Sequence, residues 1–379
     1  IQKIGDKVSS IFVPVVVVIS ILTFFINHYF FNIPFNDAFL RSIAVLVISC
    51  PCAMGLATPT AIMVGIGRAA KNGILVKGGN TLEKMASIKN IAFDKTGTIT
   101  TGNFKILDLN IIDGNEDEIK NIIYNIEKHS SHPIANSLIN ELKDYSKKLS
   151  IKNIDETNGL GITAQINNDI YFIGKEVSSN QKRKFDVYLK KNDSIIATIN
   201  LKDEIKDETQ EIINNLKEEY TTSLISGDRK EKCDELNKTL LFDKVFSNQS
   251  PEDKLKIIEK LNKENNTLMV GDGINDAPAL SKATLGVSLG NASQIAIQSS
   301  EIILLNNKNL KQLPKALKIS KHTLLTIKQN LFWAFSYNII AIPIACFGYL
   351  NPMWAALFMA FSDVIVIGNS IRLKFKRIF

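Results

Sequence analysis

A carboxylate followed by a hydroxyl-rich turn is the first feature of this sequence that is able to do chemistry. Asp94 follows the apolar run 88–93 and precedes the tetrapeptide KTGT at 95–98. An apolar run of this kind predicts a buried strand, so we expect Asp94 at its carboxyl end, where the chain turns. A carboxylate in such a place can take a phosphoryl group directly and so divide hydrolysis into two easier steps.

Three later segments carry what a phosphorylated carboxylate needs, namely a positive side chain and ligands for magnesium. They are SGD at 226–228, Lys254, and GDGIND at 271–276. Each motif alone has an ordinary interpretation as a surface turn, a helix cap or a tight loop. The acids at 271–276 lack the spacing of an EF-hand, and no GxxxxGK[ST] phosphate loop occurs in the chain.

The triplet Cys50-Pro51-Cys52 interrupts an otherwise apolar stretch. Proline has no N–H and its ring clashes with the carbonyl of Val47, so we expect a helix to open here. In lipid such an opening is tolerated where protein or a cavity satisfies the backbone. The opening lets both thiols turn toward one site, and thiolates are soft ligands that suit Cu(I). The alternative, that both cysteines are small apolar residues of a membrane helix, stays open at this point.

Four apolar segments are long enough to cross a membrane, which takes about 20 apolar residues. They cover residues 11–31, 42–67, 328–350 and 352–371. The chain of 379 residues has a net charge of +7, and its prominent basic residues flank these segments rather than the short turns between them. The positive-inside rule then puts the long middle segment in the cytoplasm. Basic residues beside a bilayer also attract anionic lipid, so the charge gives no reason to expect nucleic acid as a partner.

Between the second and third apolar segments, short apolar runs alternate with helix-like segments, which predicts a doubly wound parallel sheet. Its expected strands cover residues 88–93, 195–201, 221–226, 244–247, 267–270 and 284–289. A stretch of about a hundred residues separates the first of these strands from the second. Because such a long loop is not structureless in a compact protein, we expect a separate domain inserted into the sheet domain.

Taken together, DKTGT at 94–98, SGD at 226–228, PEDK ending at Lys254 and GDGINDAP at 271–278 resemble the motifs of the P-type ATPases of the haloacid dehalogenase-like superfamily. The resemblance covers the whole chain and implies ATP and Mg²⁺ as cofactors. It implies Asp94 as the phosphorylated nucleophile, with Mg²⁺ held by Asp94, Asp272, Asn275 and Asp276. The other catalytic residues that it implies are Lys95, Thr96, Ser226, Gly227, Asp228 and Lys254.

The resemblance implies a multidomain membrane protein with four transmembrane α-helices. Its α/β phosphorylation domain, 88–100 and 201–318, contains an inserted α+β nucleotide-binding domain, 101–200, and the membrane helices lie within 1–87 and 319–379. In the insert, SSHP at 130–133 resembles the SEHP motif of the heavy-metal branch, and GLG at 159–161 resembles its GxG. This likeness implies a nucleotide site that includes Glu127, His132, Pro133, Gly159, Gly161 and Thr98.

The last two spans bear on which metal is expected. Tyr337-Asn338 and Met359-x-x-Ser362 resemble the YN and MxxS signatures of monovalent-copper pumps. A thioether is a further soft donor that favours Cu(I) or Ag(I) over Zn(II). Asp363 stands where many copper pumps have a second Ser, and a carboxylate near the bilayer centre usually marks an ion path. The implied ligands of the transported metal are Cys50, Cys52, Tyr337, Asn338, Met359 and Ser362.

The predicted function is export of Cu(I) or Ag(I) across a bacterial cell membrane, driven by ATP through a phosphorylated Asp94. The implied partners are membrane lipid, the metal ion and a copper chaperone, with no nucleic acid. Three alternatives stay open: a divalent Zn/Cd/Co pump, a membrane-anchored phosphatase or kinase-like enzyme, and an incomplete fragment that binds metal and nucleotide. The last arises because the chain shows neither the family's actuator domain nor its earlier spans, so we expect phosphorylation without turnover.

Overall fold

The computed structural model describes residues 2–130, 132–157, 160–175, 185–306 and 308–376, which form two compact units. The first unit joins Ile1–Asp94 to Glu208–Phe379, and the second unit is Lys95–Asp207. The second unit contains the predicted insert, 101–200, and extends beyond it at both ends. The chain therefore enters the second unit directly after the predicted nucleophile.

The first unit contains a seven-stranded sheet with the order β1-β13-β12-β11-β2-β9-β10. All neighbouring strands are parallel except β1, which pairs with β13 in the antiparallel direction. Central strands β2, β11 and β12 are buried along their whole length, as their continuous apolar runs predict. The prediction of a doubly wound parallel sheet is thus confirmed. The strands are β1 (Ile74–Val76), β2 (Asn90–Asp94), β9 (Thr221–Ile225), β10 (Lys244–Phe246), β11 (Thr267–Gly271), β12 (Leu285–Leu289) and β13 (Ile302–Leu304).

Helix α9 (Pro251–Glu264) shows how local sequence positions a site residue. Ser250 caps the helix and shares a capping box with Asp253, while Pro251 occupies the first turn. These signals fix the start of α9 and so place Lys254 in its first turn. Ile258 of α9 packs against a buried cluster on one face of the sheet. The other short helices of the first unit are α4 (Gly79–Ala86), α7 (Thr209–Lys217), α8 (Lys230–Leu240), α10 (Ala277–Lys282) and α11 (Gln294–Ser299).

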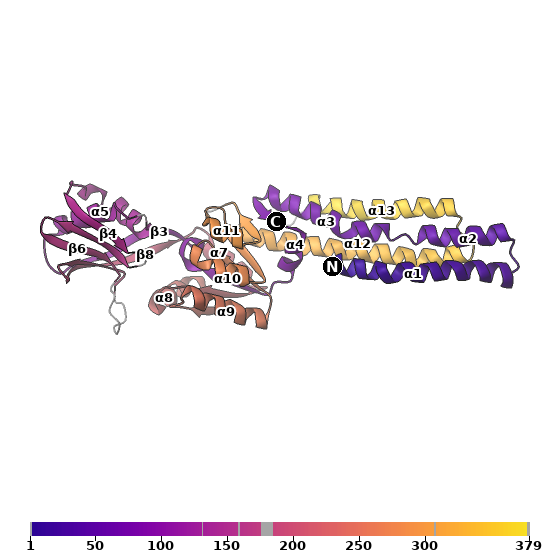
Figure 1. Ribbon diagram of the computed structural model, residues 1–379, viewed down its shortest axis with the longest axis horizontal. Coiled ribbons are helices and arrows are strands. Elements are labelled where there is room, and N and C mark those ends of the chain that lie inside the picture. Colours follow the sequence, from indigo (N-terminus) through magenta and orange to yellow (C-terminus); the bar gives the residue numbers. More distant parts are fainter. Residues whose placement is uncertain (1, 131, 158–159, 176–184, 307, 377–379) are drawn as a thin grey trace. The chain divides into compact units, whose positions relative to one another are not determined.

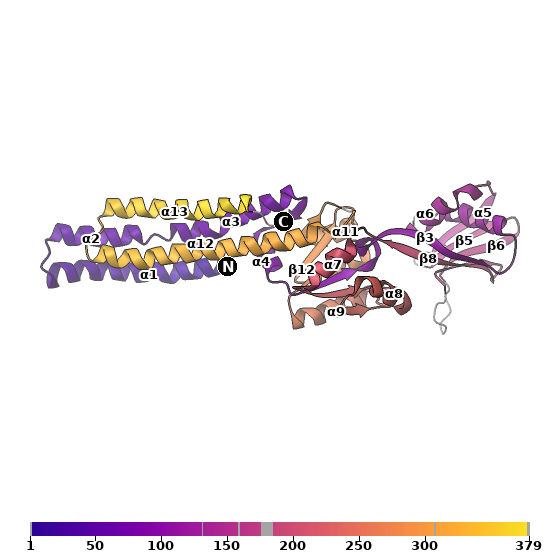
Figure 2. The ribbon, with the colours of Figure 1, turned by 180° about the vertical axis from the view of Figure 1, so that it is seen from behind.

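The second unit is a six-stranded antiparallel sheet with the order β3-β8-β7-β6-β5-β4. Helices α5 (Glu116–Glu127) and α6 (Pro133–Glu141) lie next to each other on it (Figure 2). Ile123 and Ile126 of α5 and Leu138 of α6 are fully buried in the core that they share with the sheet. The strands are β3 (Thr100–Ile111), β4 (Ile151–Thr157), β5 (Gly161–Ile166), β6 (Asp169–Gly174), β7 (Val187–Lys191) and β8 (Ser194–Ile205).

One predicted strand lies in a different sheet from the one we expected. Residues 195–201 belong to β8, which pairs with β3 and β7 in the second unit, so their assignment to the parallel sheet is wrong. The apolar run that suggested a buried parallel strand reflects packing in the core of the second unit, where Ala197 and Ile199 are buried.

Long helices form a bundle in the first unit (Figure 1). They are α1 (Gln2–Phe25), which continues into the π-helical turn Ile26–Phe30, α2 (Phe35–Ile48), α3 (Cys52–Lys71), α12 (Gln312–Cys346) and α13 (Pro352–Phe375). Large apolar side chains on the outside of the bundle are exposed, among them Val18, Ile339 and Val364. Exposed apolar surface of this extent suits a lipid surrounding.

Three stretches of the described chain are long and apolar enough to cross a membrane: Ser10–Phe30, Phe35–Lys71 and Pro352–Phe375. The fourth predicted span, 328–350, is helical as the distal part of α12 but is not among them. Polar residues such as Asn330 and Asn338 make this part of α12 less apolar than the other three stretches. It nevertheless packs in the bundle against α2, α3 and α13.

The helix opens at the Cys-Pro-Cys triplet, as predicted. α2 ends at Ile48 and α3 begins at Cys52, and the backbone between them is not helical. Pro51 occupies the cap position of α3, and the N–H of Gly55 donates to its carbonyl at 3.0 Å. The proline thus ends one helix and starts the next within a single membrane-length stretch.

Candidate functional site

Three carboxylates meet at the carboxyl edge of the parallel sheet. Asp94 ends β2, Asp272 follows β11, and Asp276 lies in the short 3₁₀ turn Ile274–Asp276. One oxygen atom from each carboxylate lies within 4.8 Å of the other two. Because β2 and β11 are parallel neighbours, their carboxyl ends bring Asp94 and Asp272 to one place.

Lys254 bridges two of these carboxylates. Its Nζ donates to Asp94 Oδ1 and, at 2.7 Å, to Asp276 Oδ1, and all three side chains are buried. Burial raises the pKa of Asp94 to about 7, and the nearby Asp276 adds to the rise, while Lys254 opposes it. Burial alone would lower the pKa of Lys254, but Asp94 and Asp276 outweigh it and raise that pKa, so the lysine stays charged.

A glycine at the end of β11 lets Asp276 approach the strand. A Cβ added to Gly271 would lie 2.9 Å from the Cβ of Asp276, which is closer than real Cβ atoms come. Asp276 Oδ2 also accepts from the N–H of Gly273 at 3.2 Å. The three carboxylates are hard oxygen ligands and so fit Mg²⁺. The side chain of Asn275, on the same turn, is exposed.

The segment 226–228 reaches the same edge from the other side of β2. β9 is the parallel neighbour of β2, and Asp94 is paired in register with Ile225, the residue before Ser226. Ser226 is buried, and its Oγ accepts from the N–H of Asp228 at 3.1 Å. The sheet topology therefore brings Ser226 and Asp94, 132 positions apart in the sequence, to adjacent strand ends.

Lys95 has a partner that the sequence did not suggest. Its Nζ lies 3.6 Å from Asp203 Oδ2 of β8, and Thr100 Oγ1 donates to the same oxygen at 2.5 Å. Lys206 Nζ donates to the carbonyl of Gly97 at 2.5 Å. These contacts join the start of the second unit to its end and give Lys95 a structural role in addition to the predicted catalytic one.

The two threonines of the DKTGT motif lie differently from each other. Thr96 has an extended backbone, with φ −73° and ψ 127°. Thr98 is fully buried, and its Oγ1 has no hydrogen-bond partner among the described residues. Thr98 is also not among the residues that line the pocket described next.

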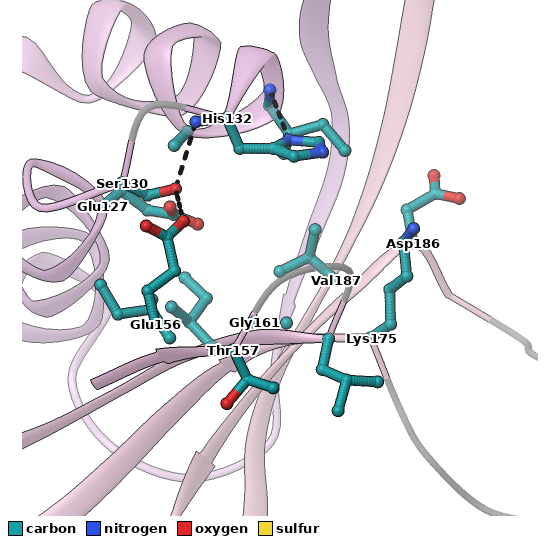
Figure 3. Close-up of a pocket in the computed structure, with 15 residues that line it drawn as sticks. Glu127, Ser130, His132, Glu156, Thr157, Gly161, Lys175, Asp186 and Val187 are labelled. Atoms are coloured by element: carbon teal, nitrogen blue, oxygen red, sulfur yellow. Dashed lines mark hydrogen bonds between the residues drawn. The ribbon is translucent and has the colours of Figure 1, made fainter. Parts of the chain in front are cut away.

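A pocket of about 100 Å³ lies in the second unit (Figure 3). Of the residues predicted to bind nucleotide, Glu127, His132 and Gly161 line it. Pro133 is the first residue of α6, and Gly159 lies outside the described residues. Gly161 has φ +156°, and an added Cβ would lie 2.3 Å from the carbonyl oxygen of Ile173, so only glycine fits there.

Charge is unevenly distributed in this pocket. Burial, followed by the neighbouring Glu156, raises the pKa of Glu127 to about 7. Burial, followed by Lys175, lowers the pKa of His132, so its imidazole is neutral at neutral pH. The N–H of Ile134 donates to His132 Nδ1 at 3.2 Å, which puts the ring proton on Nε2.

In the bundle, two apolar clusters lie on either side of one polar level. The first cluster contains Ile48, Ala341 and Ala355, and the second contains Ala53, Ala334 and Val366. Helices α12 and α13 contribute to both clusters, and the chain passes from the first cluster at Ile48 of α2 to the second at Ala53 of α3, so the residues in these three intervals lie between the clusters. The residues in these intervals include all those predicted to bind the transported metal: Cys50, Cys52, Tyr337, Asn338, Met359 and Ser362.

The polar level contains atoms without partners. The sulfur atoms of Cys50 and Cys52 are bonded to each other, so both side chains turn to one point, whereas a thiolate site requires the reduced pair. Tyr337 Oη and Asp363 Oδ1 are buried and have no hydrogen-bond partner among the described residues. An unpaired polar atom in hydrocarbon costs several kcal/mol, and neither of these two atoms has a partner that offsets this cost among the described residues.

Sequence reasoning missed Glu156, Lys175 and Asp203. No motif marks Glu156, because β4 has few apolar residues and was not predicted as a strand. Lys175 directly follows β6, and no motif marks it. Asp203 meets Lys95 only because β3 and β8 pair over about a hundred intervening residues, which no local pattern reveals.

Comparison with known proteins identifies relatives over the whole chain. Residues 88–284 match a family model described as haloacid dehalogenase-like hydrolase. The chain is 37% identical over 404 residues to the probable copper-importing P-type ATPase A of Enterococcus hirae, covering 100% of the chain and 54% of that protein. It is 39% identical over 395 residues to the copper-exporting P-type ATPase of Staphylococcus haemolyticus, covering 99% of the chain and 49% of that protein. The chain spans about half the length of these relatives.

Solved structures agree with this relationship. The catalytic domain of the CPx-ATPase CopB-B is 33% identical with a TM-score of 0.59, and the match covers 68% of this chain and 98% of that one. A zinc-transporting PIB-type ATPase in its E2.Pi state is 27% identical with a TM-score of 0.78, and the match covers 97% of this chain and 63% of that one. The chain therefore belongs to the haloacid dehalogenase-like hydrolases and, within them, to the heavy-metal branch of the P-type ATPases.

Proposed function

We propose that this chain uses ATP to export a soft monovalent ion, Cu(I) or Ag(I), by way of a phosphate on Asp94. The observation that carries the proposal is one continuous helix, α12, that joins the sheet to the polar level of the bundle. At its start, Gln312 Nε2 donates to the carbonyls of Asn72 and Gly73 at 2.8 and 3.0 Å. Farther along, the same helix carries Tyr337 and Asn338.

The phosphoryl transfer follows from the cluster around Asp94. An oxygen of Asp94 attacks the γ-phosphorus of ATP, the bond to the bridging oxygen breaks, and ADP leaves. Lys254 offsets charge on the transferred oxygens, and Ser226 stands at the neighbouring strand end to contact them. Asp94, Asp272 and Asp276 would hold Mg²⁺, which neutralises phosphate charge when bound. This mechanism distinguishes an aspartyl-phosphate pump from a binding protein.

The transported ion is proposed from the donors at the polar level. Reduced Cys50 and Cys52 supply thiolates, and Met359 supplies a thioether, a set that prefers Cu(I) and Ag(I) over Zn(II). Both P-type ATPases named above as relatives are described as copper transporters, one importing and one exporting. We infer export, a bacterial cell membrane, cytoplasmic nucleotide and phosphorylation domains, contact with membrane lipid, and delivery of the ion by a copper chaperone.

The test is phosphorylation of the full-length protein by radiolabelled ATP with Cu(I), Ag(I) or Zn(II) present. We expect an acid-stable, alkali-labile label that Cu(I) or Ag(I) stimulates and that Asp94→Asn abolishes. We expect Cys50→Ser to abolish the stimulation by metal while ATP still binds. A label that survives Asp94→Asn would overturn the nucleophile, and stimulation by Zn(II) alone would overturn the choice of ion. As a matched control, Asp113→Asn removes an exposed carboxylate and should leave the label unchanged.

A divalent ion is the second candidate, and Asp363 is the observation that favours it. A carboxylate oxygen buried without a partner suits a harder ion than a thiolate does. If Asp363 helps to bind a divalent ion, Asp363→Ser should reduce the response to Zn(II) at least about tenfold, in line with the effect of losing one charged ligand. If the ion is Cu(I), the variant should keep its metal-stimulated label, which the same assay measures.

A further inference from the structure

The nucleotide pocket of the second unit has two chemically different ends. Glu127 from α5 and Glu156 from β4 lie on one side of it, and Lys175, which follows β6, lies on the other (Figure 3). Between them, Ile162, Ile173 and other apolar side chains line the wall. A flat aromatic base fits an apolar wall, and the charged ends give it polar groups to pair with.

Glu127 and Glu156 are available to a ligand. Glu127 is 6% exposed, and none of the described residues forms a hydrogen bond or ion pair with its carboxyl group. A buried carboxyl group without a partner is costly unless something else pairs with it. Ser130 Oγ donates to Glu156 Oε1 at 2.5 Å and accepts from the N–H of His132 at 3.2 Å. Glu156 is therefore held against the turn that carries His132, with its other oxygen left for a ligand.

We propose that Glu156 determines base specificity by accepting a hydrogen bond from the exocyclic amino group of adenine, while Lys175 receives the phosphates. Adenine presents an amino donor where guanine presents a carbonyl oxygen. An ionised carboxylate only accepts, so it attracts the first and repels the second. This inference rests on the proposed function, because it takes the pocket to be the ATP site.

Glu127 complements this arrangement. Burial and Glu156 raise its pKa to about 7, so a large fraction carries a proton near neutral pH. A protonated Glu127 donates to the ring nitrogen of adenine next to the amino group. Glu127 and Glu156 together then offer one donor and one acceptor to the edge of adenine that carries the amino group and the adjacent ring nitrogen. Guanine has the opposite donor and acceptor pattern on this edge.

The experiment measures competition for a fluorescent ATP analogue bound to the whole chain in detergent, with ATP, GTP, ADP and adenosine as competitors. Glu156→Gln should lower the preference for ATP over GTP about tenfold or more, because the amide can also donate to guanine. It should leave the preference for ATP over adenosine unchanged. Lys175→Met should lower the preference for ATP over adenosine and leave the preference for ATP over GTP unchanged, since it removes the charge that pairs with the phosphates but leaves the base contacts.

The control is Asp155→Asn, which makes the same change of charge on the neighbouring residue of β4, whose side chain points to the opposite face of the sheet. It should leave both preferences unchanged. If the wild-type chain binds ATP but Glu156→Gln keeps its ATP over GTP ratio within twofold, this inference is wrong and the proposed function is untouched. If the wild-type chain binds no ATP analogue, the proposed use of ATP itself fails.

Discussion

The phosphorylation cluster and the nucleotide pocket both bury ionisable side chains, but they treat the charges in opposite ways. At the strand ends, Lys254 lies between Asp94 and Asp276, so each buried charge has a partner in the chain. In the pocket, Glu127 is buried beside a second carboxylate and has no partner among the described residues. The first arrangement holds reacting groups in place, and the second leaves a pairing group for a ligand to complete.

The difference between the two regions predicts opposite effects of removing a charge. In the first region, loss of one charge leaves its partners buried and unpaired, which destabilises the fold. In the second region, loss of the Glu127 charge relieves an unfavourable burial and stabilises the fold.

The largest expected effect is that of Lys254→Met. Two buried carboxylates, Asp94 and Asp276, then face each other without a cation. We expect a loss of about 3–5 kcal/mol in the free energy of unfolding of the first unit, the usual result of breaking a buried ion pair. We also expect phosphorylation at least about 100-fold slower, because charge on the phosphoryl oxygens is no longer offset. Denaturant unfolding and the radiolabel assay measure these two effects.

A double substitution separates the two roles of the lysine. Lys254→Met combined with Asp276→Asn removes one of the facing carboxylates and should recover part of the lost stability. It should not recover phosphorylation, because the cation is still absent. Recovery of activity in the double variant would show that Lys254 is structural only.

The next largest effect has the opposite sign and concerns Glu127→Gln. The pKa of Glu127 rises from 4.5 to about 7 on folding. Between these values the folded state holds more protons than the unfolded state, so stability falls as pH rises from about 4.5 to about 7 and is level above. At pH 8 the glutamine variant should be more stable by up to about 3 kcal/mol, and its stability should not change across this window.

Hydrogen exchange of the core amides of the second unit, measured from pH 5 to pH 8, reports this stability within the whole chain. Nucleotide binding by Glu127→Gln should be retained, because the glutamine amide can donate a hydrogen bond as the protonated carboxyl group does. Glu118→Gln, which changes an exposed carboxylate on the same helix, should leave the stability of the second unit unchanged. Equal stability of the wild type and Glu127→Gln at pH 8 would contradict the comparison between the two regions.

Sequence patterns predicted the phosphorylation cluster better than the pocket, for a physical reason. In a parallel sheet, polar residues that follow buried strands meet at one edge, so Asp94, Ser226 and Asp272 can be placed from strand prediction alone. The pocket depends on antiparallel pairings between distant segments and on a strand, β4, with little apolar patterning. Its two unpredicted residues, Glu156 and Lys175, are determined by pairing rather than by a motif.

In the bundle, too, local sequence patterns predicted some features and missed others. The opening at Pro51 follows from proline chemistry and was predicted, and so were three membrane-length stretches. That α12 is one continuous helix, Gln312–Cys346, was not predicted, because its polar residues are explained only by their contacts with other helices. The strand at 195–201 was assigned to the wrong sheet for a similar reason, since a buried apolar run does not reveal which sheet buries it.

The smallest expected effect extends the comparison to a region in which polar groups are paired but uncharged. Asn330 Nδ2 donates to the carbonyl of Ala57 at 3.2 Å and to Ser370 Oγ at 2.9 Å, and Asn330 Oδ1 accepts from Asn369 at 2.8 Å. Although these bonds join α3, α12 and α13, hydrogen bonds between membrane helices contribute only about 0.6 kcal/mol on average. We therefore expect Asn330→Leu to lower bundle stability in mixed micelles by about 1–2 kcal/mol, with the metal-stimulated label retained. As a control, Ile339→Leu on the exposed side of α12 should have no measurable effect on bundle stability. If Asn330→Leu lowers stability as much as Lys254→Met does, uncharged hydrogen bonds in the bundle matter as much as buried charges in the sheet domain.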